Sequence, residues 1–105
     1  MYARRVSLNL KPNSRADFTN ALEAEILPVL RKQKGFQDEI SFVAPERNEA
    51  VAISFWDNQE NAEAYNHAAY LDVLRVLSKV VAGMPIMDTF EVGTSTFRRI
   101  TASAV

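Results

Sequence analysis

Residues 35–58 read GFQDEISFVAPERNEAVAISFWDN, and this stretch decides the fold. Residues 36–44 and residues 50–57 are both rich in β-branched and aromatic side chains, with polar residues interleaved. The segment Pro45-Glu46-Arg47-Asn48 separates them and has the composition of a turn. Two extended runs joined by a short turn predict an antiparallel hairpin.

The segment before the hairpin predicts a strand and then a broken helix. Residues 2–10 alternate in the manner of a half-buried strand. The helix lies between Ser14 and Gly35, a glycine placed to end it. Pro28 cannot accommodate the carbonyl group four residues before it, so we expect a kink or a break near residues 24–27.

The segment after the hairpin predicts a second helix and a last strand. Asp57 or Asn58 provides the helix cap, and Gly83 ends the helix. The last strand is expected from Ile86 to about Phe97. The tail, residues 98–105, is expected to be either disordered or an arm that reaches across a dimer.

The element order β-α-β-β-α-β is that of a ferredoxin-like α+β fold with an antiparallel sheet, in one domain that spans residues 1–105. Right-handed crossovers place both helices on one face of the sheet and leave the other face bare. Tyr2, Val6, Leu8 and Leu10 are predicted on the helix side. The bare face is predicted to carry a mixed set of polar and apolar residues, namely Arg5, Ser7, Asn9, Glu39, Ser41, Val43, Ala52, Ser54, Trp56, Met87, Thr89 and Glu91. The sheet of a second copy would cover it, which predicts a homodimer with a lined cavity.

Composition excludes several classes of function. The chain has no cysteine and one histidine, which excludes a disulfide framework, a thiolate nucleophile and an iron–sulfur cluster and argues against a protein metal site. Twelve basic residues balance 13 acidic ones, so we expect no nucleic-acid partner. No apolar run is long enough to span a bilayer, and the start of the chain has no signal-like segment. We therefore expect a cytoplasmic protein without a membrane partner.

The passage Ile53-Ser54-Phe55-Trp56-Asp57-Asn58, with Gly35-Phe36 before it and Lys11-Pro12 after the first strand, resembles the antibiotic biosynthesis monooxygenase family. This resemblance implies a dimeric α+β barrel, a homodimer formed sheet to sheet, and a pocket between each sheet and its own helices or the partner. Members of the family include monooxygenases that act on phenols or quinols without a cofactor. The resemblance therefore implies that no cofactor is needed.

Residue by residue, the resemblance weakens the enzymatic interpretation. Many members carry histidines nine and fourteen residues after the tryptophan, where this chain has Tyr65 and Tyr70. The single histidine, His67, lies outside that register. In haem-degrading members the corresponding asparagine, tryptophan and haem-ligating histidine would fall near Arg5, Tyr65 and Arg75, so haem degradation is not expected.

The candidate site residues each have a plain structural alternative. His67 and Tyr65 are the candidates for acid–base chemistry, and the alternatives are a solvent-facing helix residue and a core residue. The predicted substrate-binding residues are Arg5, Ser7, Asn9, Trp56, Tyr65 and Tyr70. Trp56 could instead be a packing residue, and Arg5 could pair with Glu91. Tyr65 and Tyr70 lie about 140° apart on one helix, so they share a face only if the helix breaks between them.

Two functions follow. The first is a homodimer whose pocket binds a small aromatic or lipophilic molecule without catalysis. The alternative is a cofactor-independent monooxygenase that oxidises a phenol or quinol with dioxygen. In that mechanism the deprotonated substrate itself reduces oxygen, and the protein supplies desolvation, hydrogen bonds and orientation.

Overall fold

The structure is a computed structural model and describes residues 1–102. The elements in chain order are β1 (Tyr2–Asn9), α1 (Arg15–Ala21), the π-helical segment η1 (Leu22–Ile26), α2 (Leu27–Arg31), β2 (Phe36–Ala44), β3 (Glu49–Trp56), α3 (Gln59–Ala68), α4 (Tyr70–Leu77) and β4 (Ile86–Glu91).

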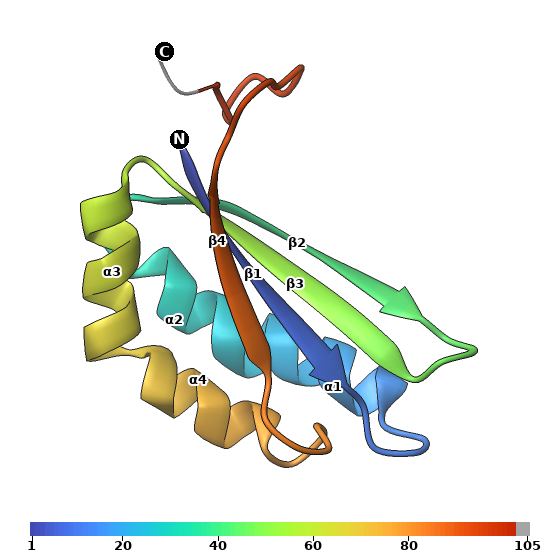
Figure 1. The fold of residues 1–105 in the computed structure, drawn as a ribbon. Coiled ribbons are helices and arrows are strands. Elements are labelled where there is room, and N and C mark those ends of the chain that lie inside the picture. Colours follow the sequence, from blue (N-terminus) through green and yellow to red (C-terminus); the bar gives the residue numbers. More distant parts are fainter. Residues whose placement is uncertain (103–105) are drawn as a thin grey trace.

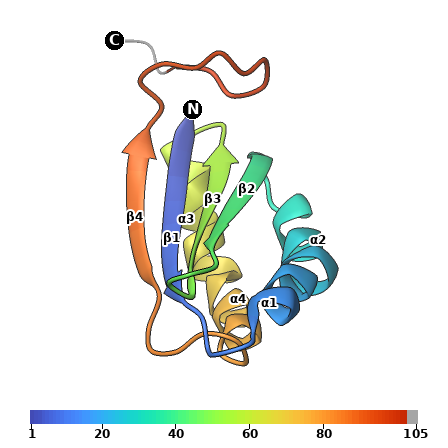
Figure 2. The same cartoon turned by 90° about the vertical axis from the view of Figure 1, so that its right-hand side faces the viewer.

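The strands form one antiparallel sheet in the order β2-β3-β1-β4, so the two central strands are β1 and β3. All the helices lie on one side of this sheet, as the side view in Figure 2 shows. Figure 1 looks onto the other side, which no helix covers. The predicted ferredoxin-like α+β fold with a bare sheet face is confirmed.

The first helix is interrupted where Pro28 predicts an interruption. α1 gives way to η1 at Leu22, and α2 begins at Leu27 with the proline in its first turn. A proline has no N–H to donate and its ring crowds the carbonyl group of residue 24, so a wider π turn relieves the clash. The chain therefore bends across the sheet without leaving it.

The second helix is also interrupted, although the sequence has no proline or glycine between residues 59 and 77. Ala69 has φ −132° and ψ −17°, which is outside the helical region and separates α3 from α4. Asn58 caps α3 as predicted, because its side-chain oxygen accepts a hydrogen bond of 2.9 Å from the backbone N–H of Asn61. The break turns α4 against the sheet and changes which helix residues meet.

The strand faces differ from the prediction on three of the four strands. In an antiparallel pair, directly opposite residues share a face. The helix side of β1 was predicted correctly, but Ser54 pairs with Arg4 and Ala52 pairs with Val6, so their strand turns the small residues to the helices. The residues on the helix side that were predicted on the bare face are Glu39, Ser41, Val43, Ala52, Ser54, Trp56, Met87, Thr89 and Glu91.

The bare face, called the open face from here on, is the more apolar side of β2 and β4 and the more polar side of β1. Its members are Ala3, Arg5, Ser7, Asn9, Asp38, Ile40, Phe42, Ala44, Glu49, Val51, Ile53, Phe55, Ile86, Asp88 and Phe90. Alternation separates the two faces of a strand but does not tell which one meets the helices. Most of the buried core residues come from the helices, and in the middle of β3 the residues beneath them, Ala52 and Ser54, are small.

The last strand is shorter than predicted. β4 ends at Glu91, which pairs with Tyr2, the first residue of β1. Beyond that point β4 has no strand beside it, so the ladder cannot continue to Phe97. The described part of the tail folds back on the same chain: Arg99 lies 3.3 Å from Asp38, and Ile100 is buried. The end of the predicted tail, residues 103–105, lies outside the described residues.

Gly35 is required by the packing of α3 on the loop before β2. Its φ is +83°, and an added Cβ would overlap the side chains of Asp57 and Asn61, which hydrogen-bond to each other at 2.8 Å. Gly83 has a similar φ of +73°, but nothing lies within 4 Å of its added Cβ. At both glycines a side chain would strain the left-handed backbone, but only at Gly35 would it also overlap neighbouring atoms.

We expect Gly35→Ala to lower the free energy of unfolding by about 2–4 kcal/mol and Gly83→Ala by about 1 kcal/mol. Both variants place an alanine in the left-handed backbone region, but only in Gly35→Ala does the added Cβ overlap Asp57 and Asn61. Urea unfolding of the two variants measures the difference. An equal decrease in the free energy of unfolding for both variants would show that overlap with Asp57 and Asn61 is not what requires a glycine at position 35.

Candidate functional site

A cavity lies between the sheet and its own helices, with about 40 Å³ of free space. Its wall is mainly apolar, and it has one polar region. The lining residues are Arg4, Val6, Leu8, Phe18, Leu22, Ile26, Leu30, Glu39, Ala52, Ser54, Tyr65, Tyr70, Val73 and Leu77. This volume holds one or two water molecules and is smaller than the roughly 150 Å³ in which an engineered protein cavity binds benzene.

The cavity exists because small side chains occupy the middle of β3 on the helix side. Ala52 and Ser54 leave room that a larger residue would fill. The π segment η1 supplies Leu22 and Ile26 to the opposite wall. Residues next to both helix breaks therefore line the cavity, because Tyr65 and Tyr70 flank the break at Ala69.

A polar row crosses the sheet at the edge of this cavity. Arg4 pairs in register with Ser54 on β3, and Ser54 pairs with Glu39 on β2. Neighbouring strands lie about 4.8 Å apart, so the backbones of Arg4 and Glu39 are about 10 Å from each other. A cation and a carboxyl group thus face the same cavity from two strands, with a hydroxyl group between them.

Arg4 is the most unusual residue of the cavity, because it is an arginine with only 3% of its surface exposed. Its Nη2 donates a hydrogen bond of 2.9 Å to Oδ1 of Asn66. Its guanidinium carbon lies 4.9 Å from the ring centre of Tyr65 and 4.5 Å from that of Tyr70. Arginine above aromatic faces is favourable, and more so where water is excluded.

Glu39 brings a titratable carboxyl group to the cavity. Its Oε1 is buried and has no hydrogen-bond partner among the described residues. Burial raises the pKa of this carboxyl group above its ordinary value, because the charged form loses solvation. The group is consequently more basic than an exposed glutamate, which suits a proton acceptor.

Tyr65 and Tyr70 meet at the cavity because α3 and α4 part at Ala69. Their ring centres are 6.0 Å apart. Burial raises the pKa of Tyr65 to about 12, although the charge of Arg4 acts in the opposite direction. Burial also raises the pKa of Tyr70. Both hydroxyl groups therefore stay protonated near neutral pH and can donate hydrogen bonds.

Trp56 lies beside the cavity lining and does not belong to it. It is fully buried, stacks on Tyr65 at 5.0 Å, and meets the edge of Phe36 at 5.6 Å. Its Nε1 donates a hydrogen bond of 2.9 Å to the Ser54 hydroxyl oxygen. This is the packing role that was the alternative for Trp56, and it fixes the side chains that line the cavity.

The other predicted site residues lie elsewhere. Arg5, Ser7 and Asn9 are on the open face, across the sheet from the cavity. The predicted pair of Arg5 with Glu91 is wrong: Arg5 lies opposite Asp88 and pairs with it at 2.7 Å. His67 is exposed and lines a surface cleft between α3 and β4 rather than the cavity.

Arg4 is the residue that sequence reasoning missed. The signal was present, because Arg4 occupies the same face as Tyr2, Val6 and Leu8 in a strand that alternates. An arginine within an apolar face is a candidate for a buried functional cation. Glu39 was noticed but was placed on the wrong side of the sheet.

In the part of the chain that the structure describes, no group of histidine, cysteine, aspartate or glutamate side chains is arranged to hold a metal ion. Within residues 1–102 no helix has the length and apolar character needed to cross a membrane.

Comparison with known proteins identifies the fold. No protein-family model matches the sequence, and no curated protein matches it. A Nitrosomonas europaea protein of unknown function is 15% identical and matches with a TM-score of 0.74, over 91% of this chain and 92% of its own. SnoaB, a cofactor-independent oxygenase of Streptomyces nogalater, is 13% identical and also has a TM-score of 0.74, over 90% of this chain and 95% of its own.

A monooxygenase of Streptomyces coelicolor, solved in complex with nanaomycin D, is 13% identical with a TM-score of 0.73, over 85% of this chain and 84% of its own. Further matched structures are named antibiotic biosynthesis monooxygenases. Identities this low establish the fold and not the reaction. The chain therefore has the fold of the antibiotic biosynthesis monooxygenases.

Proposed function

We propose that the chain is a homodimer, formed sheet to sheet, in which each subunit binds a small aromatic or lipophilic molecule between its sheet and its helices. The observation that carries the binding site is the cavity itself, with its apolar wall and a few polar groups at one side. Small-molecule sites generally have this character. The dimer rests on a separate observation.

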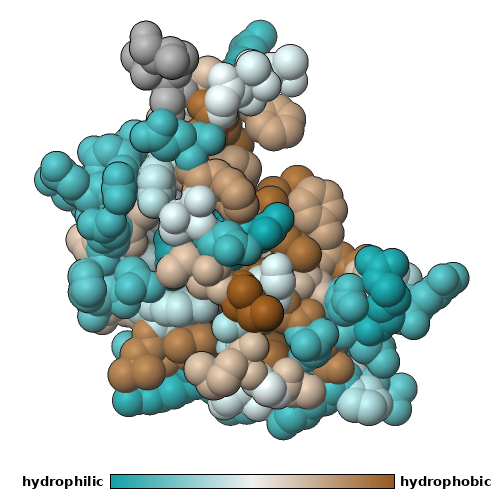
Figure 3. Space-filling model, viewed as in Figure 1, coloured by the Kyte–Doolittle hydropathy of each residue, from teal (hydrophilic) through white to brown (hydrophobic). Residues whose placement is uncertain are grey.

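The open face supports the dimer. Phe42 on one edge strand and Ile86 on the other are 55% and 65% exposed, and both lie on this face. Figure 3 shows hydrophobic side chains over the strands, with a hydrophilic patch among them and hydrophilic side chains around the edge. Exposed apolar side chains gathered on one face often mark an interaction site. A second copy offers the matching flat and apolar sheet.

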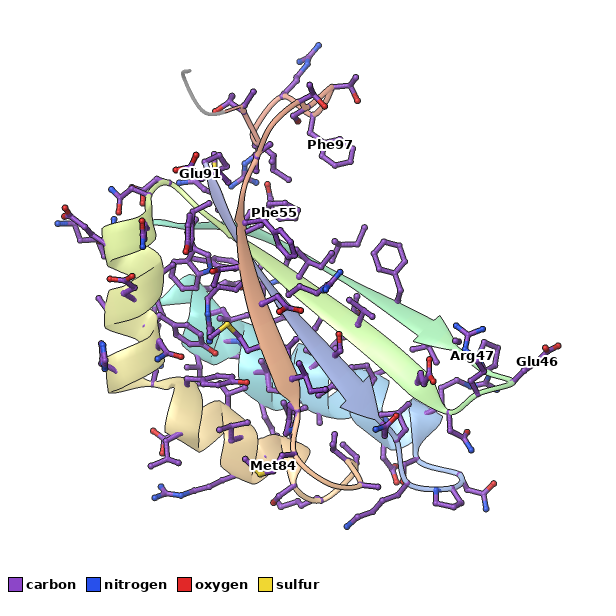
Figure 4. The ribbon with its side chains drawn as sticks, in the orientation of Figure 1. Glu46, Arg47, Phe55, Met84, Glu91 and Phe97 are labelled. Carbon is purple, nitrogen blue, oxygen red and sulfur yellow. The ribbon has the colours of Figure 1, made fainter. Side chains whose placement is uncertain are left out.

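The labelled side chains in Figure 4 mark the limits of this surface. Glu46 and Arg47 lie at the tip of the β2–β3 hairpin, and Met84 lies in the loop before β4. Phe97 lies near Phe55 at the opposite end, and both line a hollow that the tail helps to form. The tail thus adds apolar surface at one end of the open face.

We expect Phe42→Glu to convert a dimer of micromolar or better affinity to a monomer, since a carboxylate would be buried without a partner. Leu71→Glu is the matched control, because Leu71 is 63% exposed on α4, away from the open face. Sedimentation velocity measures both variants and the wild type. A wild-type chain that stays monomeric at micromolar concentration would contradict the dimer.

Ligand entry requires the cavity to widen, because about 40 Å³ does not admit an aromatic ring. The wall formed by η1 is the part best suited to move. π turns are rare single-turn interruptions of α-helices and are frequent at functional sites. Outward movement of Leu22 and Ile26 would enlarge the cavity directly above Ala52.

We expect Ala52→Val to fill the free space, to raise the free energy of unfolding by about 1 kcal/mol, and to weaken the binding of phenol and 1-naphthol about tenfold or more. Ala44→Val is the control, because Ala44 is on β2 but does not line the cavity. Calorimetric titration gives the affinities. Undiminished binding by Ala52→Val would place the ligand elsewhere.

The alternative function is oxidation of a phenol or quinol by dioxygen without a cofactor. Glu39 favours it, because a buried carboxyl group of raised pKa at the cavity could accept the phenolic proton. Arg4 would stabilise the resulting phenolate. For an anthrone, the substrate supplies the electrons, one oxygen atom enters it as the new carbonyl group, and the other leaves as water.

An oxygen electrode separates the two functions. With hydroquinones and anthrones in excess, an oxygenase consumes oxygen faster than buffer does, and the Ala52→Val protein loses this rate together with the binding. Binding without oxygen uptake at high protein concentration would leave the ligand-binding function and exclude the oxygenase for these substrates.

A further inference from the structure

The arginines of the described chain differ in how their charge is balanced. The arginines that form ion pairs are all partly or largely exposed, and the pairs are Arg5–Asp88, Arg47–Glu49, Arg75–Asp72 and Arg99–Asp38. Arg4 is almost completely buried, yet no carboxylate of residues 1–102 lies within 4 Å of its guanidinium group. The arginine that most needs a counter-ion is thus without one.

A buried cation without an anion is costly, by several kcal/mol in real proteins. The faces of Tyr65 and Tyr70 offset part of this cost, and Asn66 accepts one hydrogen bond. All three partners are neutral near neutral pH, because burial raises the pKa of both tyrosines. The guanidinium group therefore keeps its full charge and its capacity to bind an anion.

The two acidic residues that border the spaces around Arg4 do not serve as its counter-ion. Glu39 faces the cavity from two strands away, and its pKa is raised by desolvation, with no lowering by Arg4 among the causes. Glu63 borders the surface cleft on the other side of Arg4, is exposed, and accepts a hydrogen bond of 2.9 Å from Gln59. The charge of Arg4 is consequently left for a molecule from outside the chain.

We propose that the ligand of the cavity is an organic anion, whose ionised oxygen, carboxylate or phenolate, binds the guanidinium group of Arg4. This inference rests on the proposed function and names the class of ligand. The apolar wall favours a carbon skeleton on the anion, because Leu22, Ile26 and Val73 offer it apolar surface and no hydrogen-bonding group. Tyr65 and Tyr70 add donors beside Arg4, and the Glu39 carboxyl group disfavours a second negative charge.

The experiment compares anions with uncharged molecules of the same shape. Benzoate is paired with benzamide, and 4-nitrophenolate with 4-nitroaniline, at a pH at which both acids are ionised. We expect the wild-type protein to bind each anion at least about tenfold more tightly than its neutral partner, as a charge-assisted hydrogen bond predicts. The pair with the larger preference distinguishes a carboxylate from a phenolate ligand.

Arg4→Met keeps an unbranched apolar stem in place of the arginine stem and removes the charged guanidinium group. We expect this variant to bind benzamide as the wild type does and to lose the preference for benzoate. Arg75→Met is the matched control, since Arg75 is exposed and pairs with Asp72 on α4. It should keep the full preference.

The outcomes separate the inference from the function on which it rests. Equal affinity of the wild-type protein for anion and neutral partner overturns the inference and leaves the binding function standing. No binding of any of the four compounds overturns the proposed function itself. A preference that survives in Arg4→Met shows that another group binds the anion. If Arg4→Met fails to fold, the wild-type comparison still decides the class of ligand.

Discussion

Both crossover connections of this fold lie on one face of a four-stranded sheet, and this constraint determines the rest of the structure. Each strand must therefore serve two environments. On the helix side, small residues such as Ala52 and Ser54 leave a cavity under the helices. On the open face, larger residues such as Ile53 and Phe55 form a surface fit for a second copy. The proposed ligand binding and the proposed association would thus use alternate residues of the same strands.

The polar side of the cavity is built around the positive charge of Arg4. Arg4 comes from the first strand, and Tyr65, Tyr70 and Asn66 come from the helix pair that Ala69 divides. Without the break, the two tyrosines would point about 140° apart and could not both reach the guanidinium group. Trp56 supports this arrangement through its stacking on Tyr65. The polar side of the cavity is therefore built by packing, and it leaves the positive charge without a negative partner.

The order of the elements, the hairpin, the Pro28 interruption and the Asn58 cap follow from local patterns, and the structure confirms them. The face that each strand turns to the helices cannot be predicted from local patterns. β3 has apolar residues on both sides, and alternation separates the two faces without showing which one meets the helices. The break at Ala69 has no local signal, since alanine is the best helix former. Of the predicted binding residues, Tyr65 and Tyr70 line the cavity, whereas Arg5, Ser7 and Asn9 were chosen on the assumption that the open face holds the site.

The proposed ligand site lies between the sheet and its own helices, on Arg4. A crystal structure of the full chain with benzoate tests this placement. We expect the carboxylate within hydrogen-bond distance of the Arg4 guanidinium group and the ring between Ala52 and the displaced side chains of Leu22 and Ile26. Benzoate held between two sheets beside Arg5, with the cavity closed, would contradict it.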